Sequence, residues 1–226
     1  RVDDVETLFA MADTLGKQPR PRGPRLAIVS NAAGPGILAT DALVRAGGEL
    51  APVSPATIDE LNTVLPPYWN RNNPVDVVAD ADPDRYSAAL AAVAKDPAND
   101  GMLVILTPQA TTDPTATAEA IGRMDRGHGK PVIASWMGGD AVAQGARILT
   151  EHMVPCFAYP DAAARVYAAM WRYSYALRGL YETAQPLSGE GGEAREEARR
   201  IVGAARALGR VSLTEEESKA VLSAYG

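Results

Sequence analysis

The sequence predicts an α/β fold, a doubly wound parallel sheet of five or six strands with helices on both faces and a C-terminal helical extension. Short apolar segments alternate with amphipathic helical segments along most of the chain, which is the order that strand–helix–strand crossovers produce. The segment from Met102 to Leu106 is continuously apolar, as expected for a parallel strand covered on both faces. With 226 residues, 46% of them hydrophobic, the chain is long and apolar enough to bury such a core.

The predicted elements follow one another in a regular order. The segment from Val2 to Leu15 places Val5, Leu8, Phe9 and Ala12 at helical spacing, and a Gly- and Pro-rich run follows it. We interpret residues 1–24 as a helix and linker from a preceding domain. The strands expected after it are 26–29, 50–53, 74–78, 102–106, 132–136 and 155–158. The helices expected between them are 36–46, 58–65, 83–94, 113–124 and 140–151.

The C-terminal part of the chain predicts a change of organisation. A long helix is expected over 161–181, and the Pro-, Gly- and Ser-rich segment 185–192 is typical of a domain boundary. A charged helix is expected over 193–208. Thr214 followed by Glu217 has the form of a capping box that opens one more helix. The predicted domains are therefore 1–24, 25–184 and 185–226.

Composition excludes several classes of function. A formal net charge of -6 and a sequence pI of about 5.0 argue against a nucleic-acid partner, because binding to phosphate backbones requires a clustered basic face. One cysteine, Cys156, cannot form an internal disulfide, and no apolar run approaches the roughly 18 residues of a membrane span. These features indicate a cytoplasmic protein without a membrane contact.

No catalytic or metal-ligating constellation is visible. His128 and His152 are not spaced to pair with cysteine or with each other, so we expect surface roles for both and no metal site. Neither histidine lies near a serine or cysteine in a nucleophile motif. The sequence therefore predicts no catalytic residue in this chain.

The sharpest candidate for binding is the loop 30–36, Ser-Asn-Ala-Ala-Gly-Pro-Gly, which follows a strand and precedes a helix. Ligands of doubly wound sheets bind beyond the carboxyl ends of the strands. Gly34 and Gly36 let the backbone approach a ligand, and Pro35 suits the first helical turn. Exposed N–H groups and the helix dipole would then favour phosphate. A plain tight turn is the alternative, and the lysine of a P-loop is absent.

Other loops are expected to line the same crevice. Asp140 is a candidate helix N-cap, as is Asp113, and Trp136 suits either a domain interface or the core. Asp76 would either orient its loop by accepting backbone N–H groups or contact a ligand. The crevice-lining residues predicted from these loops are Asp76, Thr107, Pro108, Gln109, Trp136, Gly138 and Gly139.

Three segments in order resemble the CoA-ligase module of NDP-forming (ADP-forming) acyl-CoA synthetases. They are RLAIVSNAAGPGILATDA at 25–42, NPVDV at 73–77 and KPVIASWMGG at 130–139. The chain is more distantly similar to the carboxyl-terminal domain of the succinyl-CoA synthetase β subunit. This resemblance, which runs from about residue 1 to 181 and into the tail, implies a flavodoxin-like CoA-ligase domain at 25–184. Ala33 departs from the family, in which many members carry glycine.

The resemblance also implies a reaction. Acyl-CoA, ADP and phosphate give carboxylate, CoA and ATP through a phosphohistidine that lies in a preceding domain, and neither His128 nor His152 matches it. The helix opened by residues 34–36 matches one of two helices whose N-termini face the phosphohistidine, with Gly36 and Ile37 as N–H donors. The phosphate-binding residues so implied are Asn31, Ala33, Gly34, Gly36 and Ile37.

The implied partners lie outside this chain. They are a CoA-binding domain, the phosphohistidine domain and an ATP-grasp domain, whose first helix residues 213–226 resemble. CoA, ATP or ADP, and Mg belong to the complete acid-thiol ligase of the acetate–CoA ligase type, and the isolated chain is expected to be inactive and to bind no cofactor. Two alternatives stay open: a regulatory, synthetase-like domain of a protein lysine acetyltransferase, and a free-standing binding module. Apolar surface left exposed would favour a homo-oligomer.

Overall fold

The computed structural model describes residues 2, 4–125, 127–181 and 191–225. The chain divides into two compact units, Arg1–Gly179 and Leu180–Gly226. In the first unit the strands are β1 (Arg25–Ser30), β2 (Glu49–Leu50), β3 (Val75–Asp76), β4 (Gly101–Leu106), β5 (Val132–Trp136) and β6 (Cys156–Phe157). The predicted boundary segment 185–192 lies, apart from its last two residues, outside the described residues.

Helices connect these strands in the predicted alternation. They are α1 (Val5–Lys17), α2 (Ala33–Arg45), α3 (Pro55–Val64), α4 (Pro83–Lys95), α5 (Pro114–Gly122), α6 (Ala143–Glu151) and α7 (Pro160–Tyr181), with a 3-10 turn, η1 (Gly139–Val142), before α6. Among the described helices, none combines the length and the apolar character that a membrane span requires.

The six strands form one parallel sheet in the order β2-β1-β4-β5-β6, and β3 also pairs with β1. β2 pairs with the start of β1 and β3 with its end. Between them the buried Asn73 side chain takes the place of a strand, since its Oδ1 accepts from Ile28 N–H at 2.9 Å and its Nδ2 donates to Leu26 O at 3.0 Å. The predicted parallel sheet is confirmed.

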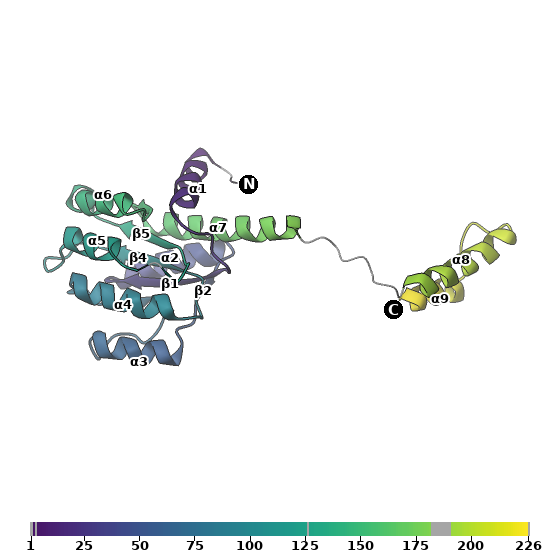
Figure 1. Ribbon diagram of the computed structural model, residues 1–226, viewed down its shortest axis with the longest axis horizontal. Coiled ribbons are helices and arrows are strands. Elements are labelled where there is room, and N and C mark those ends of the chain that lie inside the picture. Colours follow the sequence, from purple (N-terminus) through teal and green to yellow (C-terminus); the bar gives the residue numbers. More distant parts are fainter. Residues whose placement is uncertain (1, 3, 126, 182–190, 226) are drawn as a thin grey trace. The chain divides into compact units, whose positions relative to one another are not determined.

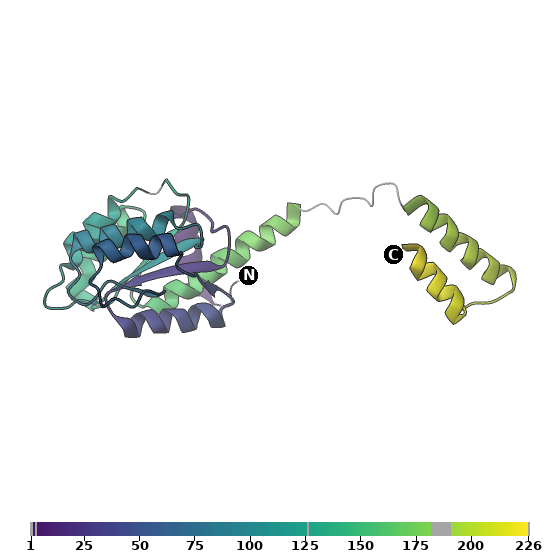
Figure 2. The same ribbon diagram turned by 90° about the horizontal axis from the view of Figure 1, so that it is seen from below.

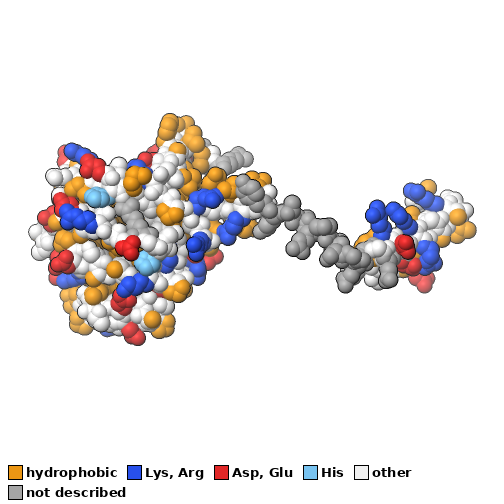
Figure 3. All heavy atoms as spheres, in the orientation of Figure 1, with side chains coloured by type: hydrophobic (Ala, Val, Ile, Leu, Met, Phe, Trp, Pro, Cys, Tyr) orange, Lys and Arg blue, Asp and Glu red, His pale blue; other side chains and the backbone are white. Residues whose placement is uncertain are grey.

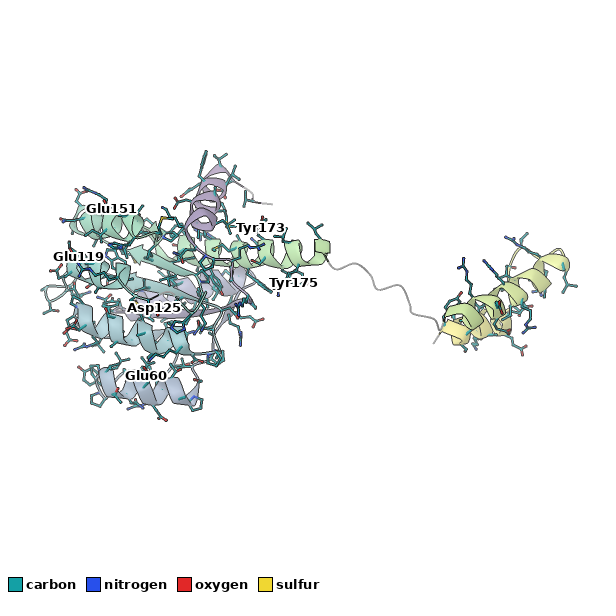
Figure 4. All side chains as sticks on the ribbon, viewed as in Figure 1. Glu60, Glu119, Asp125, Glu151, Tyr173 and Tyr175 are labelled. Atoms are coloured by element: carbon teal, nitrogen blue, oxygen red, sulfur yellow. The ribbon has the colours of Figure 1, made fainter. Side chains whose placement is uncertain are left out.

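Helices cover both faces of this sheet, as predicted (Figures 1 and 2). One apolar cluster joins the sheet to α3, α4, α5 and α6, and a second joins its other face to α1, α2 and α7. All six residues of β4 are buried, which explains why its sequence is continuously apolar. At the surface, Glu60 of α3 pairs with Lys95 of α4 at 2.7 Å, and Tyr173 and Tyr175 project from α7 (Figure 4).

The first helix packs on the α/β unit. Met11 and Thr14 of α1 are buried. Gln18, just after the helix, accepts from Val132 N–H at 2.8 Å and donates to Met153 O at 2.5 Å. The apolar side chains that the helical spacing predicted to be buried face solvent instead, since Val5 is 67% and Phe9 70% exposed.

The second unit contains a pair of helices, α8 (Gly191–Ala207) and α9 (Glu215–Tyr225). The predicted capping box is confirmed, because Thr214 N–H donates to Glu217 Oε2 at 2.8 Å and Glu217 N–H donates to Thr214 Oγ1 at 3.3 Å. Arg210 donates to both carboxylate oxygens of Glu217, and this contact is the main reason that the pKa of Glu217 falls to about 2. Ile201 and Ala205 form the small buried contact of this unit.

Candidate functional site

The helix α2 begins directly after β1 and its N-terminus carries unused backbone donors. The N-cap residue, Ala32, has no side chain that can accept from the first turn. Pro35 has no N–H, and Gly36 N–H donates to Ala32 O at 3.4 Å. The donors at this end are therefore the N–H groups of Ala33 and Gly34. The family resemblance implied Gly36 and Ile37 as donors, but the helix starts three residues earlier than expected, so their N–H groups belong to the helical ladder.

The two glycines of this loop have different roles. A Cβ on Gly34 would meet no atom within 4 Å, so the space above the first turn is open. A Cβ on the buried Gly36 would lie 3.2 Å from Pro74 Cβ, so this glycine is needed for close packing. Gly34 alone therefore offers a ligand an approach to the backbone.

Asn31 fixes this loop from behind through its contacts with Thr107. Its Oδ1 accepts from Thr107 N–H at 2.9 Å and from Thr107 Oγ1 at 3.2 Å, and its Nδ2 donates to Thr107 O at 2.8 Å. The side chain is 2% exposed. Asn31 thus ties the end of β1 to the end of β4, and its effect on a ligand would be through position.

Two further residues, which the sequence did not single out, help to fix the backbone before α2. Ser30 Oγ donates to Ala32 O at 2.8 Å and accepts from Ala32 N–H at 3.1 Å, which fixes the residue before the helix. The buried Tyr86 hydroxyl donates to Ile105 O at 2.9 Å. Burial raises the pKa of Tyr86, and a hydrogen bond from the Asn31 backbone opposes this. The Tyr86 contact has no sequence signal, because it depends on the order of the strands, whereas the Ser30 contact is local and joins residues two positions apart.

The structure brings several other predicted residues to the same edge. Pro108 and Gln109 are exposed there, next to Thr107. A Cβ on Gly138 would lie 2.8 Å from Pro108 Cγ, so the loops after β4 and β5 touch. Gly138 and Gly139 have φ of 151° and 56°.

Asp76 and Asp113 act on their own backbones. Asp76 Oδ1 accepts from Val78 N–H at 2.9 Å, which is the loop-orienting role. Asp113 caps α5 as predicted, with Oδ1 accepting from Thr115 N–H at 3.0 Å and Ala116 N–H at 2.9 Å.

The loop after β5 decides between the two roles left open for Trp136 and corrects the one expected of Asp140. Trp136 takes the core role and not the crevice-lining one, since it is 2% exposed, packs in the core and donates from Nε1 to Pro114 O at 3.1 Å. Asp140 was expected to cap a helix, but it lies inside η1, and the N-cap of α6 is Val142. The paired glycines allow a tight 3-10 turn here, which moves the helix start beyond Asp140.

Positive potential at this edge can come only from backbone N–H groups. The segments 31–38, 107–113 and 137–140 contain no lysine or arginine, and they carry the carboxylates of Asp113 and Asp140. His128 and His152 are exposed and lie in other loops. Burial raises the pKa of Cys156 to about 11, so its thiol is neutral at pH 7. In the described part of the chain, no three His, Cys, Asp or Glu side chains are grouped as metal ligands would be.

Residues 26–180 match the Ligase-CoA domain family. The chain belongs to this family. The resemblance predicted from the three motifs is thereby confirmed, and the match covers the sheet and every helix that packs on it except α1.

Individual relatives agree with this assignment. The chain is 34% identical over 226 residues to the 4-hydroxybutyrate–CoA ligase (ADP-forming) of Nitrosopumilus maritimus, covering 100% of this chain and 32% of that protein. It is 38% identical over 170 residues to acetate–CoA ligase (ADP-forming) I of Archaeoglobus fulgidus, covering 75% of this chain and 24% of that protein. The chain thus spans about a third or less of the length of these relatives.

A solved relative has the same fold. The dinucleotide forming acetyl-coenzyme A synthetase 1 of Ca. Korarchaeum cryptofilum, in complex with phosphate and ADP, aligns with a TM-score of 0.76 and 26% sequence identity. The alignment covers 81% of this chain and 40% of that chain.

Proposed function

We propose that the chain is the Ligase-CoA module of an ADP-forming acyl-CoA synthetase, and that the N-terminus of α2 stabilises the phosphoryl group in transfer. The observation that carries this proposal is the pair of N–H groups on Ala33 and Gly34, which have no side-chain cap and belong to exposed residues. Two aligned amides at the positive end of a helix favour an anion without a lysine or arginine. Fixed donors of this kind are effective because they do not reorganise during the reaction.

The support around the two donors fits this role. Asn31, Ser30 and Tyr86 hold the end of β1 through buried or half-buried hydrogen bonds. Ile37 is 58% exposed beside the donors and offers an apolar contact to the domain that presents the phosphohistidine. Pro108, Gln109, Gly138 and Gly139, from the touching loops after β4 and β5, would line the site from the neighbouring strands.

The complete enzyme would catalyse the reversible conversion of acyl-CoA, ADP and phosphate into carboxylate, CoA and ATP. The phosphohistidine, the CoA site and the ATP-grasp site with its Mg would be supplied by other domains. The acyl group would be selected there as well, and the named relatives indicate acetate and 4-hydroxybutyrate as the first substrates to try.

The test is ATP formation by the complete gene product from acetyl-CoA or 4-hydroxybutyryl-CoA, ADP and phosphate. Gly34→Leu fills the open space over the donors, and Gly16→Leu is the matched control, because both glycines lie in helices and would place a Cβ against nothing within 4 Å. We expect Gly34→Leu to lower kcat/KM at least about a hundredfold, as loss of a fixed oxyanion donor does, and Gly16→Leu to stay within about twofold.

Two outcomes would contradict the proposal in different ways. Equal activity of Gly34→Leu and Gly16→Leu would reject the phosphoryl role of α2. A folded, unsubstituted protein that forms no ATP from either acyl-CoA would favour the regulatory domain of a lysine acetyltransferase.

A further inference from the structure

The outer face of α1 exposes a row of apolar side chains in the described part of the chain. Val5 is 67%, Leu8 53% and Phe9 70% exposed, and Ala12 is exposed as well. These positions recur at helical spacing, so they share one side of the helix, and Figure 3 shows hydrophobic side chains gathered over α1. Contiguous apolar groups on a surface mark a place where another surface docks.

The opposite face of the same helix is fixed on the sheet. Met11 and Thr14 are buried there, and Met11 belongs to the apolar cluster that α1 shares with α2 and α7. Just after the helix, the Gln18 side chain bonds the α/β unit through both its oxygen and its nitrogen. The helix cannot turn its outer face inward without losing these contacts. A helix with apolar residues on both sides is normally covered on both sides, so the cover of the outer face comes from another surface.

We propose that this cover is α1 of a second copy of the chain, which lies antiparallel to it across a twofold axis. A twofold contact joins the same surface of two copies, so that surface must complement itself. The charges of α1 meet this condition, because its first turn carries Glu6 and its last turn carries Lys17. Antiparallel pairing places Glu6 of each copy beside Lys17 of the other, and it also sets the two helix dipoles in opposite directions.

The apolar side chains fit the same arrangement. The large side chains of Val5, Leu8 and Phe9 occupy the first half of the outer face, and the smaller Ala12 follows them. In an antiparallel pair, the large side chains of one copy lie towards the smaller residue of the other, which lets the two helices pack closely. A parallel pair would instead bring the two acidic first turns together, and like charges there repel each other.

This contact is separate from the proposed phosphoryl site. The helix α1 lies before β1, outside the segment 26–180 that matches the Ligase-CoA domain family, and it shares no residue with the start of α2. The donors at the start of α2 all belong to one protomer. Dimer formation and ATP formation can therefore fail independently of each other.

Sedimentation velocity of the 226-residue chain between about 1 and 100 μM measures the association. We expect the mass to rise with concentration from 23.8 kDa towards twice that value. Phe9→Glu puts a charge in the middle of the outer face and should weaken association at least about tenfold. Tyr68→Glu is the matched control, because Tyr68 is 71% exposed in the loop before β3, and it should change association less than about twofold.

Cross-linking tests the antiparallel geometry. Residues near a twofold axis face their own copies, and when Glu6 lies beside Lys17 the axis passes close to Ala12. Ala12→Cys should therefore form a covalent dimer with a short bis-maleimide. Ala176→Cys, which replaces an exposed alanine of α7, is the control and should stay monomeric. Burial raises the pKa of the native Cys156, so its neutral thiol should not react.

Four results would overturn the proposal. A mass of 23.8 kDa at every concentration would mean that the chain does not pair with itself. A dimer that Phe9→Glu leaves intact would use another surface. A dimer that Phe9→Glu breaks but that Ala12→Cys does not cross-link would not be antiparallel. In the complete gene product, a monomer whose Ala12→Cys thiol resists the maleimide would show that another part of the same polypeptide covers α1. Circular dichroism of each variant checks that the helices remain folded.

Discussion

The starts of α2 and α5 lie on the same edge of the sheet, after the neighbouring strands β1 and β4, yet they treat their backbone donors in opposite ways. At α5, Asp113 Oδ1 occupies the first turn by accepting from Thr115 and Ala116 N–H. At α2, Ala32 stands at the capping position and supplies no acceptor.

This difference shows which end is available for an external anion. A helix whose own carboxylate satisfies the first turn both uses the donors and repels a phosphate. The start of α2 keeps its donors, and half-buried hydrogen bonds of Asn31 and Ser30 fix the loop without using them. The helix is thus held in place by contacts behind it.

The largest expected effect comes from removing that support. Asn31→Ala deletes three hydrogen bonds to Thr107 and leaves the half-buried partner groups unsatisfied, so we expect the free energy of unfolding to fall by about 3 kcal/mol. Urea denaturation of the chain measures this. Asn70→Ala is the control, because Asn70 is exposed and its loss should remove less than about 1 kcal/mol. Equal losses would show that Asn31 does not hold the loop.

Gly138→Ala tests the contact between the loops after β4 and β5. The added methyl would lie 2.8 Å from Pro108 Cγ at a φ of 151°, and we expect about 2 kcal/mol of destabilisation. Gly139→Ala has a positive φ of 56° but open space, and should lose only about 1 kcal/mol. A Gly138→Ala protein as stable as the control would mean that the two loops are not packed together.

Much of this fold follows from local pattern. The strands β4 and β5 were predicted to within a residue, because a buried parallel strand is apolar throughout. The caps at Asp113 and Thr214 were predicted as well, since each depends on residues two or three positions apart.

What the sequence could not predict depends on contacts distant in the chain. The tie between Asn31 and Thr107 spans 76 positions and requires β1 and β4 to be neighbours. The start of α2 was placed three residues late, because glycine and proline signal a turn locally while the packing of Gly36 on Pro74 allows the helix to extend through them. The buried face of α1 could not be identified from the sequence for the same reason. Both faces of this helix carry apolar residues, and only packing against the sheet determines which face is buried.

Removing the cap of α5 should have a moderate effect. Asp113→Ala leaves two first-turn donors without an acceptor, and we expect about 1 kcal/mol less stability. Asp113→Asn keeps an oxygen acceptor and should lose less. ATP formation by the complete protein should change little in either variant, because the donors at α2 are untouched. Loss of activity comparable to that of Gly34→Leu would mean that α5 is also part of the phosphoryl site.

The smallest expected change in stability belongs to Ala32→Asp, which gives α2 the same kind of side-chain cap that Asp113 gives α5. This variant is the sharpest test of the proposed role of α2. Ala32 has extended φ and ψ of -144° and 125°, so the introduced carboxylate is positioned to accept from Gly34 N–H and should raise stability by about 0.5–1 kcal/mol. If that amide serves the phosphoryl group, the more stable protein must form ATP more slowly, and Ala32→Asn, which caps without charge, should fall between the two. A stabilised Ala32→Asp protein with undiminished ATP formation would show that the open end of α2 has no part in the reaction. A more stable Ala32→Asp protein that forms ATP more slowly would show that the reaction requires a helix start without a side-chain cap.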